Sequence, residues 1–289
     1  MKTKAPCRIS FAGGGTDIQD YCSRYGGCCL AASIARYCYA TYGEVNPRPS
    51  LMEKEITRYF NADDKLKISS SLPPMSGLGG SASACVAGIK AVAPDLDWRK
   101  IAETAYDIER RRMNILGGYQ DQIEAAFGGL LYLEFGEGMR ARIERLEIPD
   151  GLEELLMLVY MGDRKNPGHD VIRDQLRRFN KRALDMTKEI ANEMRRCIHN
   201  RRLFRDFGRL MEEAWQVKRE FSPLVTNPKI DEFHDWALKN GAIAFKLCGA
   251  GSGGYALLME DPERKGMLTR ALVNYEPVEF DRKGVRLCK

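Results

Sequence analysis

The residues best suited to chemistry lie in a glycine-rich stretch, PPMSGLGGSAS, which runs from Pro73 to Ser83. It follows a strand-like run at 65–70 and leads into an apolar run of small residues at 82–92 that predicts a helix. The first amides of a helix have no intrahelical partner and carry about half a positive charge, and glycine lets the backbone approach an oxyanion closely. The stretch therefore predicts a phosphate site. The alternative is a helix N-terminus capped by serine.

A second glycine segment, KLCGAGSGGYALL, formally satisfies the dinucleotide pattern GxGxxG at Gly249, Gly251 and Gly254. That fingerprint requires a helix after the glycines and an acidic residue about 20 positions later, whereas YALLM suits a short strand. No segment of the chain fits the Walker pattern GxxxxGK[ST]. We therefore expect two strands joined by a glycine turn, and a phosphate site of neither of these two types.

The composition is that of an ordinary globular chain. Of 289 residues, 44% are hydrophobic and 29% are charged, which argues against disorder. No apolar run approaches the roughly 20 residues of a membrane span. The first nine residues are polar and basic without a long apolar run behind them, so we predict no signal peptide and a cytoplasmic location. The length is typical of one or two domains, and we expect two.

Cysteine content and charge narrow the expected partners. Nine cysteines without a CxxC pair, and few histidines near them, favour reduced thiols over a zinc site. The net charge of +5 is modest, and many basic residues alternate with acids in helical stretches such as 173–205, as on a solvated face. No basic stripe with interleaved aromatic residues is visible. We expect small anionic molecules as partners and no nucleic acid or membrane.

The elements that position these motifs form two blocks. Strands are predicted at 4–12, 28–34, 39–45, 65–70, 130–135 and 141–148, and helices at 81–92, 98–112 and 120–127. After Pro149-Asp150-Gly151 we predict strands at 155–161, 242–248, 254–259 and 278–287, amphipathic helices up to about 220, and helices at 229–240 and 263–273. This mixture of sheet and helix predicts an α+β fold with one domain at 1–150 and a second at 151–289.

Three segments in order, PCRISFAGGGTD, PPMSGLGGSAS and CGAGSGG, resemble the ordered motifs of the GHMP small-molecule kinases. The resemblance covers nearly the whole chain. It implies an N-terminal domain like domain 2 of ribosomal protein S5 and a ferredoxin-like, helix-rich C-terminal domain. Within the superfamily, GGGTD, the YGG at 25–27 and GGYQDQIEAAFGG at 117–129 look most like sugar 1-kinases that act on D-glycero-D-manno-heptose 7-phosphate.

In this superfamily the loop after Pro73 wraps the triphosphate of ATP with backbone amides, and Mg²⁺ takes over part of a lysine's electrostatic role. The resemblance implies ATP contacts from Pro74, Ser76, Gly77, Leu78, Gly79, Gly80, Ser81 and Ala82. Ser81 falls on the second serine of the family's GLGSSA pattern, which implies a hydroxyl ligand of Mg²⁺. Gly80 replaces the first serine, so we expect one phosphate contact to be lost. Glu109 matches the family's acidic magnesium ligand, with a solvated helix face as the alternative.

The catalytic assignment also comes from the resemblance. Asp121 aligns with an aspartate beside the attacking hydroxyl, which implies a base that orients the hydroxyl and receives its proton. Arg8 aligns with a basic residue beside that aspartate, where it would keep Asp121 ionised and stabilise the transferring charge. The alternatives are a helix acid favoured by the dipole and a solvated strand residue.

The acceptor assignment rests mainly on the first motif. Thr16 and Asp17 match the HTD segment of galactokinase-like members, where the aspartate accepts hydrogen bonds from sugar hydroxyls. A turn aspartate without a ligand is the alternative. Gly14 and Gly15 stand where galactokinases carry Glu and His, which favours a bulkier or phosphorylated sugar over galactose.

Four further residues complete the expected substrate contacts. We expect Gly118 and Gly251 beside the substrate, although Gly251 also belongs to a tight turn near the phosphate loop. The loop GDRKNPGH at 162–169 offers Arg164 and Lys165 as a cationic seat for the substrate's own phosphate, with ordinary exposed loop charges as the alternative.

The sequence thus predicts a kinase that uses ATP and Mg²⁺ to phosphorylate the anomeric hydroxyl of a heptose 7-phosphate. Fucose, galactose or another sugar is the nearest alternative substrate. A sensor that holds sugar and nucleotide without turnover is the alternative class, and the presence of Asp121, Arg8 and Ser81 argues against it. The oligomeric state, including a homo-oligomer, stays open.

Overall fold

The computed structural model describes residues 1–164, 168–198 and 203–288. Within these ranges the strands are β1 Lys2–Ala12, β2 Gly27–Tyr42, β3 Leu66–Ser70, β4 Leu130–Phe135, β5 Ala141–Leu146, β6 Leu156–Tyr160, β7 Ala242–Leu247, β8 Tyr255–Glu260, β9 Glu276–Pro277 and β10 Arg286–Leu287. The α-helices are α1 Gln19–Tyr25, α2 Leu51–Tyr59, α3 Gly80–Val92, α4 Trp98–Asp107, α5 Gln120–Phe127, α6 Leu152–Leu155, α7 Gly168–Arg178, α8 Lys181–Cys197, α9 Leu203–Arg219, α10 Pro228–Lys239 and α11 Met267–Ala271. Short 3₁₀ turns lie at Glu137–Met139 and Pro262–Arg264.

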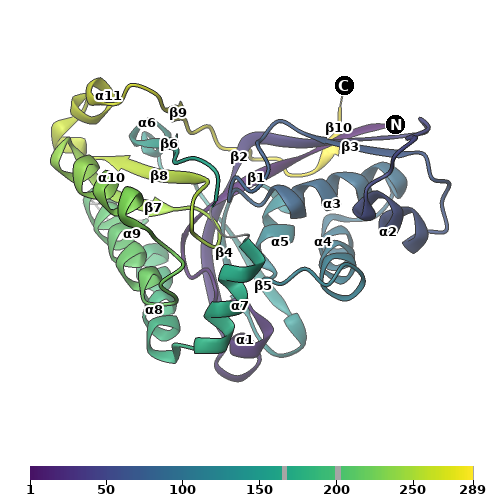
Figure 1. The fold of residues 1–289 in the computed structure, drawn as a ribbon, viewed down its shortest axis with the longest axis horizontal. Coiled ribbons are helices and arrows are strands. Elements are labelled where there is room, and N and C mark those ends of the chain that lie inside the picture. Colours follow the sequence, from purple (N-terminus) through teal and green to yellow (C-terminus); the bar gives the residue numbers. More distant parts are fainter. Residues whose placement is uncertain (165–167, 199–202, 289) are drawn as a thin grey trace.

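The first sheet is antiparallel and is built around the long strand β2. Its order is β10-β1-β2-β4-β5, and β3 pairs with the far half of β2. One edge of β2 thus pairs with β4 over 27–32 and with β3 over 38–42, while β1 runs along its other edge. Both ends of the chain meet in this sheet, because Thr3 of β1 pairs with Leu287 of β10 (Figure 1).

Strand β1 is buried almost throughout because helices contact it from both halves of the molecule. Helices α3 and α5 pack on it from the N-terminal half, and α8 and α9 from the C-terminal half. The ring of Phe11 meets that of Phe207 on α9 edge to face, with centroids 4.9 Å apart. Residues at the end of β1 therefore lie where the two halves face each other.

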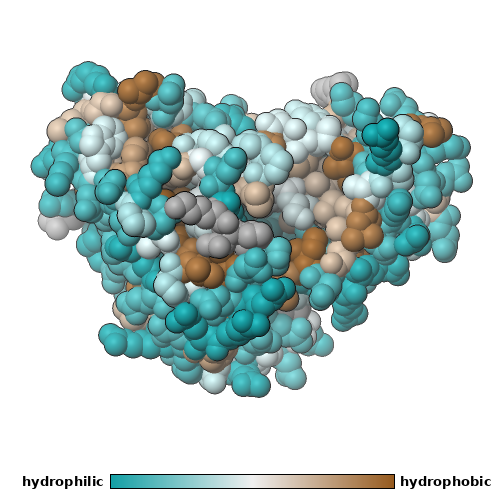
Figure 2. All heavy atoms as spheres, in the orientation of Figure 1, coloured by the Kyte–Doolittle hydropathy of each residue, from teal (hydrophilic) through white to brown (hydrophobic). Residues whose placement is uncertain are grey.

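The second sheet belongs to the C-terminal half and has the order β7-β8-β6-β9. Helices α9 and α10 contact β7, and α8 packs beside α9 (Figure 1). The amphipathic helices predicted up to about residue 220 are α7, α8 and α9, and the predicted helix at 229–240 is α10. Figure 2 shows a largely hydrophilic face that is hollowed between the two halves.

Several predicted boundaries are wrong. The strands predicted at 28–34 and 39–45 are the single strand β2, which continues through a bulge opposite Pro6, where the register shifts between Pro6 and Cys7. The helix predicted at 263–273 is interrupted at Gly266, which adopts φ +87° and precedes α11. Of the strand predicted at 278–287, only Arg286–Leu287 (β10) forms a strand, and β9 lies just before the predicted range. Helices α1 and α2 were not predicted.

The helix predicted at 98–112 changes its winding near its end. It is α-helical to Asp107 and continues as a π-helix at Ile108–Arg112, closed by the bond from the Met113 amide to the Ile108 carbonyl (3.0 Å). Glu109 lies in this π-helical turn, a feature that is frequent at functional sites.

The predicted division at 150 places β10 with the second domain, although it pairs with β1 in the first sheet. The division therefore stays a prediction. In the described part of the chain, no helix combines the length and the apolar character that crossing a bilayer demands.

Candidate active site

The glycine loop 73–79 leads directly into α3, as the sequence predicts. The N-cap of α3 is Gly79 in the left-handed region, and no side chain caps the helix. The alternative of a capping serine is therefore wrong: Ser81 lies inside the helix, and its hydroxyl donates to Glu109 instead. The first amides of α3 stay available for an anion.

Two close backbone approaches hold this loop in place. Gly77 has φ +87°, and a Cβ there would lie 2.7 Å from the carbonyl oxygen of Cys248. A Cβ on Gly254 would lie 2.4 Å from the carbonyl oxygen of Ser76, which accepts from the Tyr255 amide (2.9 Å). The turn between β7 and β8 therefore packs against the phosphate loop, and glycine is required at both contacts.

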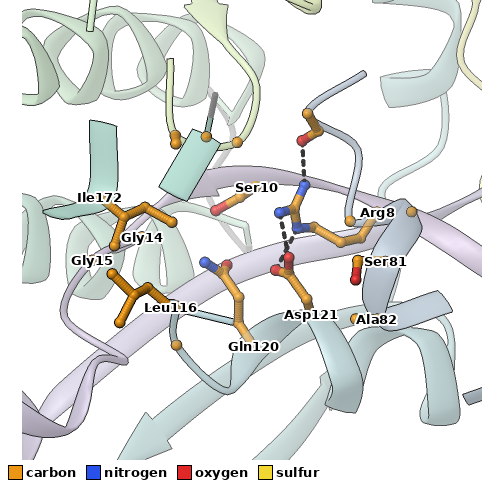
Figure 3. A pocket seen from close by; sticks show the side chains of 18 of the residues that line it. Arg8, Ser10, Gly14, Gly15, Ser81, Ala82, Leu116, Gln120, Asp121 and Ile172 are labelled. Carbon is orange, nitrogen blue, oxygen red and sulfur yellow. Dashed lines mark hydrogen bonds and ion pairs between the residues drawn. The ribbon is translucent and has the colours of Figure 1, made fainter. Parts of the chain in front are cut away.

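Arg8 of β1 and Asp121 of α5 form a bidentate ion pair at the centre of the cavity (Figure 3). Arg8 Nε donates to Asp121 Oδ1 (2.8 Å) and Nη2 to Oδ2 (2.7 Å). Arg8 Nη1 donates to the Gly77 carbonyl (2.7 Å), so the same guanidinium joins the carboxylate to the phosphate loop. Burial opposes the charge of Arg8, but the Asp121 carboxylate raises its pKa overall.

Glu109 supplies a second buried carboxylate. Its Oε1 accepts from the Ser81 hydroxyl (2.6 Å), and its Oε2 accepts from the side-chain amide of Gln122. Burial raises the pKa of Glu109. The π-helical turn and the first turn of α3 thus bring the two predicted magnesium ligands into contact.

Asp17 ties the first motif to the start of α5. Its Oδ1 accepts from the Gly15 amide (3.0 Å) and its Oδ2 from the Gln120 amide (3.1 Å). Burial raises the pKa of Asp17. A Cβ on Gly118 would lie 1.8 Å from Asp17 Oδ2, so Gly118 leaves the space that the carboxylate fills.

Two polar atoms beside this group have no hydrogen-bond partner within the described structure, namely Ser10 Oγ and Gln120 Oε1. Both residues line the cavity and lie against Gly14, whose Cβ would sit 3.6 Å from Ser10 Oγ and 3.4 Å from Gln120 Nε2 (Figure 3). Buried polar groups are normally satisfied, so unpaired atoms at a cavity wall are suited to a polar ligand.

Arg164 lies at the phosphate-loop end of the cavity. Its Nη2 approaches within 2.8 Å of where a Cβ would sit on Gly77 and also on Gly249. Burial and the neighbouring charge of Arg8 lower the pKa of Arg164, and its Nε has no partner among the described residues. Lys165, the other predicted cation of this loop, lies outside the described residues.

All these groups surround one cavity of about 560 Å³. Of the predicted site residues, those on its wall are Arg8, Gly14, Gly15, Asp17, Pro74, Ser76, Gly77, Gly79, Gly80, Ser81, Ala82, Glu109, Gly118, Asp121 and Arg164. The structure does not bring Thr16, Leu78 or Gly251 to this wall. The Thr16 hydroxyl donates to the Gly13 and Cys28 carbonyls, and Gly251 packs against Val225.

Several polar residues of the cavity wall were not predicted from the sequence. They include Ser10, Gln120, Gln122, Thr187, Lys218 and Lys246. Gln120 and Gln122 flank Asp121 in GGYQDQ, so their position next to the predicted catalytic residue could have identified them as site residues. Lys246 is the one charged residue in the apolar run AIAFKLC.

Comparison with known proteins decides the family. The model for the GHMP kinases N terminal domain matches residues 32–129, and that for the GHMP kinases C terminal matches residues 194–274. The D-glycero-alpha-D-manno-heptose 7-phosphate kinase of Campylobacter jejuni is 30% identical over 337 residues, covering 99% of this chain and 98% of the relative. The chain belongs to the GHMP kinases. The predicted family and its two-domain α+β fold are thereby confirmed.

Two further relatives differ in how much of their own length matches this chain. The crystal structure of a D-glycero-D-manno-heptose 1-phosphate kinase from Bacteroides thetaiotaomicron has a TM-score of 0.79 and 25% identity, covering 100% of this chain and 98% of that one. The bifunctional fucokinase/GDP-fucose pyrophosphorylase of Arabidopsis thaliana is 28% identical over 235 residues, which are 75% of this chain but only 22% of the relative. Of these three relatives, the two heptose kinases match over nearly the full length of both chains.

Proposed function

We propose that this GHMP kinase transfers the γ-phosphoryl group of ATP to the anomeric hydroxyl of a sugar phosphate, with D-glycero-D-manno-heptose 7-phosphate as its substrate. The observation that carries the proposal is the Arg8–Asp121 pair, which joins a carboxylate facing the acceptor region to the carbonyl of Gly77 in the phosphate loop. The heptose is proposed from the names of two relatives that match this chain over nearly its full length. As an ATP-dependent enzyme of metabolism it would act in the cytoplasm.

Asp121 would orient the acceptor hydroxyl and take its proton. The hydroxyl oxygen then forms a bond to the γ-phosphorus while the bond to the β–γ bridging oxygen breaks and ADP leaves. Arg8 would hold the Asp121 carboxylate in place through its two hydrogen bonds and stabilise the charge that moves onto the phosphoryl oxygens. The uncapped amides of α3 and the loop before it would hold the triphosphate.

Ser81 and Glu109 fit a magnesium ion, because a hydroxyl and a carboxylate are the oxygen donors that this cation prefers. In the described ranges, no group of three or more His, Cys, Asp or Glu side chains is placed to hold a metal. The other ligands would therefore be phosphate oxygens and water, as is usual for Mg²⁺. Bound there, the ion would neutralise charge on the β- and γ-phosphates.

Asp17, Ser10 and Gln120 would face the hydroxyls of the sugar. The oxygens of Ser10 and Gln120 support this, because neither has a hydrogen-bond partner in the described structure and a sugar hydroxyl could provide one. Gly14 leaves room for the sugar ring between them.

A substrate panel tests the proposal. ADP release would be followed with D-glycero-D-manno-heptose 7-phosphate, the corresponding 1-phosphate, free heptose, fucose, galactose and mevalonate. Both the 7-phosphate and the 1-phosphate are included because the names of the two relatives differ on this point. We expect the highest kcat/KM with the 7-phosphate. Preferential turnover of the 1-phosphate or of a neutral sugar would contradict the proposal, and nucleotide and sugar binding without ADP release would favour the sensor.

A further inference from the structure

We infer that Lys218 of α9 and Lys246 of β7 form the seat for the second phosphate group of the acceptor, the one that does not react. This inference rests on the proposed function and names residues to which no role has been given above. Both side chains line the cavity, and their residues are only 9% and 5% exposed, respectively. A lysine is rarely buried to this extent without a partner.

Both ammonium groups have hydrogen-bond donors that no described residue uses. Lys218 Nζ donates to the carbonyls of Leu247 (2.9 Å) and Gly249, which leaves one of its three hydrogens. The backbone of Lys246 pairs with Leu257 in the second sheet, but its ammonium group makes no hydrogen bond or ion pair with the residues that the structure describes. A phosphate, with its several acceptor oxygens, could use the free donors of both.

Among the described residues, no carboxylate forms an ion pair with Lys218 or Lys246. Asp121 is paired with Arg8, Glu109 accepts from Ser81 and Gln122, and Asp17 accepts from backbone amides. Besides burial, the neighbouring cations Lys246, Arg164 and Arg8 also lower the pKa of Lys218. Burial lowers the pKa of Lys246 to about 8 and that of Lys218 well below its ordinary value, because the charged form loses its solvation there.

Their position assigns these lysines to the acceptor rather than to ATP. Lys246 lies close enough to Cys29 of β2 to interact with it, and Cys29 packs under Gly13 of the GGGTD segment. The same segment is held to the C-terminal helices by the bond from the Gly13 amide to Thr187 Oγ1 (3.1 Å), and Thr187 lines the cavity.

Arg164, one of the two cations expected from the sequence to hold this phosphate, lies at the glycine-loop end of the same cavity. The guanidinium of Arg164 is wedged between Gly77 and Gly249, beside the loop that would carry the triphosphate. Arg164 is therefore better placed for ATP. Lys218 also reaches this region through its bond to the Gly249 carbonyl, so Lys246, whose ammonium group has no partner among the described residues, is the main contact that we expect for the acceptor's phosphate.

The test variant is Lys246→Met, which keeps an apolar stem of similar length and removes only the charge. Losing one charge-assisted contact should raise the KM for heptose 7-phosphate by about 10- to 100-fold. The preference for heptose 7-phosphate over free heptose, as a ratio of kcat/KM values, should fall by the same factor, while the KM for ATP changes far less. The matched control is Lys239→Met, an exposed lysine on α10, which should leave all three quantities at the parent's values. Thermal unfolding checks that both variants fold.

Direct titration with heptose 7-phosphate, without nucleotide, separates this inference from the proposed function. Weaker binding to Lys246→Met than to the parent, with ATP binding retained, supports the seat even if turnover of the sugar phosphate is slow. A change mainly in the KM for ATP, an equal effect on phosphorylated and free heptose, or unaltered heptose 7-phosphate binding would overturn the seat and leave the kinase assignment standing. A parent that binds no sugar phosphate would overturn it as well.

Discussion

Asp121→Asn should damage stability and chemistry together, and the geometry of the Arg8 pair sets the size of both effects. In the parent each carboxylate oxygen accepts one bond from Arg8, at 2.8 and 2.7 Å. Asparagine presents an NH₂ group in place of one oxygen. One of the two hydrogen bonds is then lost, because two donor groups face each other at that contact. The guanidinium, whose side chain is 6% exposed, would then keep its charge without a full partner. Because the Asp121 side chain is 27% exposed, the loss should be roughly 2–4 kcal/mol, at or below that for a fully buried pair.

The chemical effect should exceed what destabilisation explains. Loss of a positioned base is worth about 10² to 10⁴ in kcat, and some rate should survive through Arg8, magnesium and the loop amides. Arg8→Met should also slow the chemical step. In the double variant, the unpaired charge is gone, so the unfolding free energy should recover relative to Asp121→Asn, whereas activity should not.

The measurements are urea unfolding, nucleotide binding and single-turnover rates for the parent and the three variants. We expect ATP affinity to change little in Asp121→Asn and the two rate losses to combine to less than their product. A near-parental single-turnover rate in Asp121→Asn would mean that the base lies elsewhere or that none is required. Additive stability losses in the double variant would refute the reasoning about the unpaired guanidinium.

Three further predictions follow from other parts of the molecule. Ser81→Ala removes an oxygen donor beside the Glu109 carboxylate, so half-maximal activity should require a higher Mg²⁺ concentration, and an unchanged magnesium titration would argue against a metal site here. Gly77→Ala should lower stability by at least about 1 kcal/mol and raise the KM for ATP, because its φ is +87° and its Cβ would meet a carbonyl oxygen at 2.7 Å. Gly80→Ala, whose Cβ would meet nothing within 4 Å, should cost less on both measures, and equal losses would contradict the argument. His234 Nε2 lies 2.8 Å from a glutamate carboxylate, whose hydrogen bond raises the pKa of His234 above the unfolded value of about 6.5. The stabilisation is therefore complete below that value and is lost as pH rises through the folded pKa, so His234→Gln should cost about 1 kcal/mol more unfolding free energy at pH 5.5 than at pH 9, as measured by urea unfolding.

The sequence was most informative where one short segment carries the feature. The glycine loop and the helix after it are contiguous in the sequence. Glycine is required at a position such as Gly77 because of its positive φ and its close backbone contact. The contact between Arg8 and Asp121, which are 113 positions apart, was expected only through the family resemblance. The missed helix α2 did have a local signal, since Ser50 and Glu53 form a capping box.

Other features had no local signature. Lys218 lies in an amphipathic helix whose charged residues read as a solvated face, and only the docking of α9 on β7 buries it. The two predicted strands form the single strand β2 because a bulge in its pairing with β1, around Pro6, lets the strand continue. Both the burial of Lys218 and the continuity of β2 result from tertiary packing, which the hydrophobic periodicity of the sequence does not predict.

The position of the transferred phosphate tests the central claim most directly. Purified protein, ATP, Mg²⁺ and D-glycero-D-manno-heptose 7-phosphate would be incubated, and the product followed by ³¹P and ¹H NMR. The account predicts one new phosphate resonance coupled to the anomeric proton, appearing in step with ADP, while the 7-phosphate resonance persists. No ADP formation, or a new phosphate on any carbon other than C1, would contradict it.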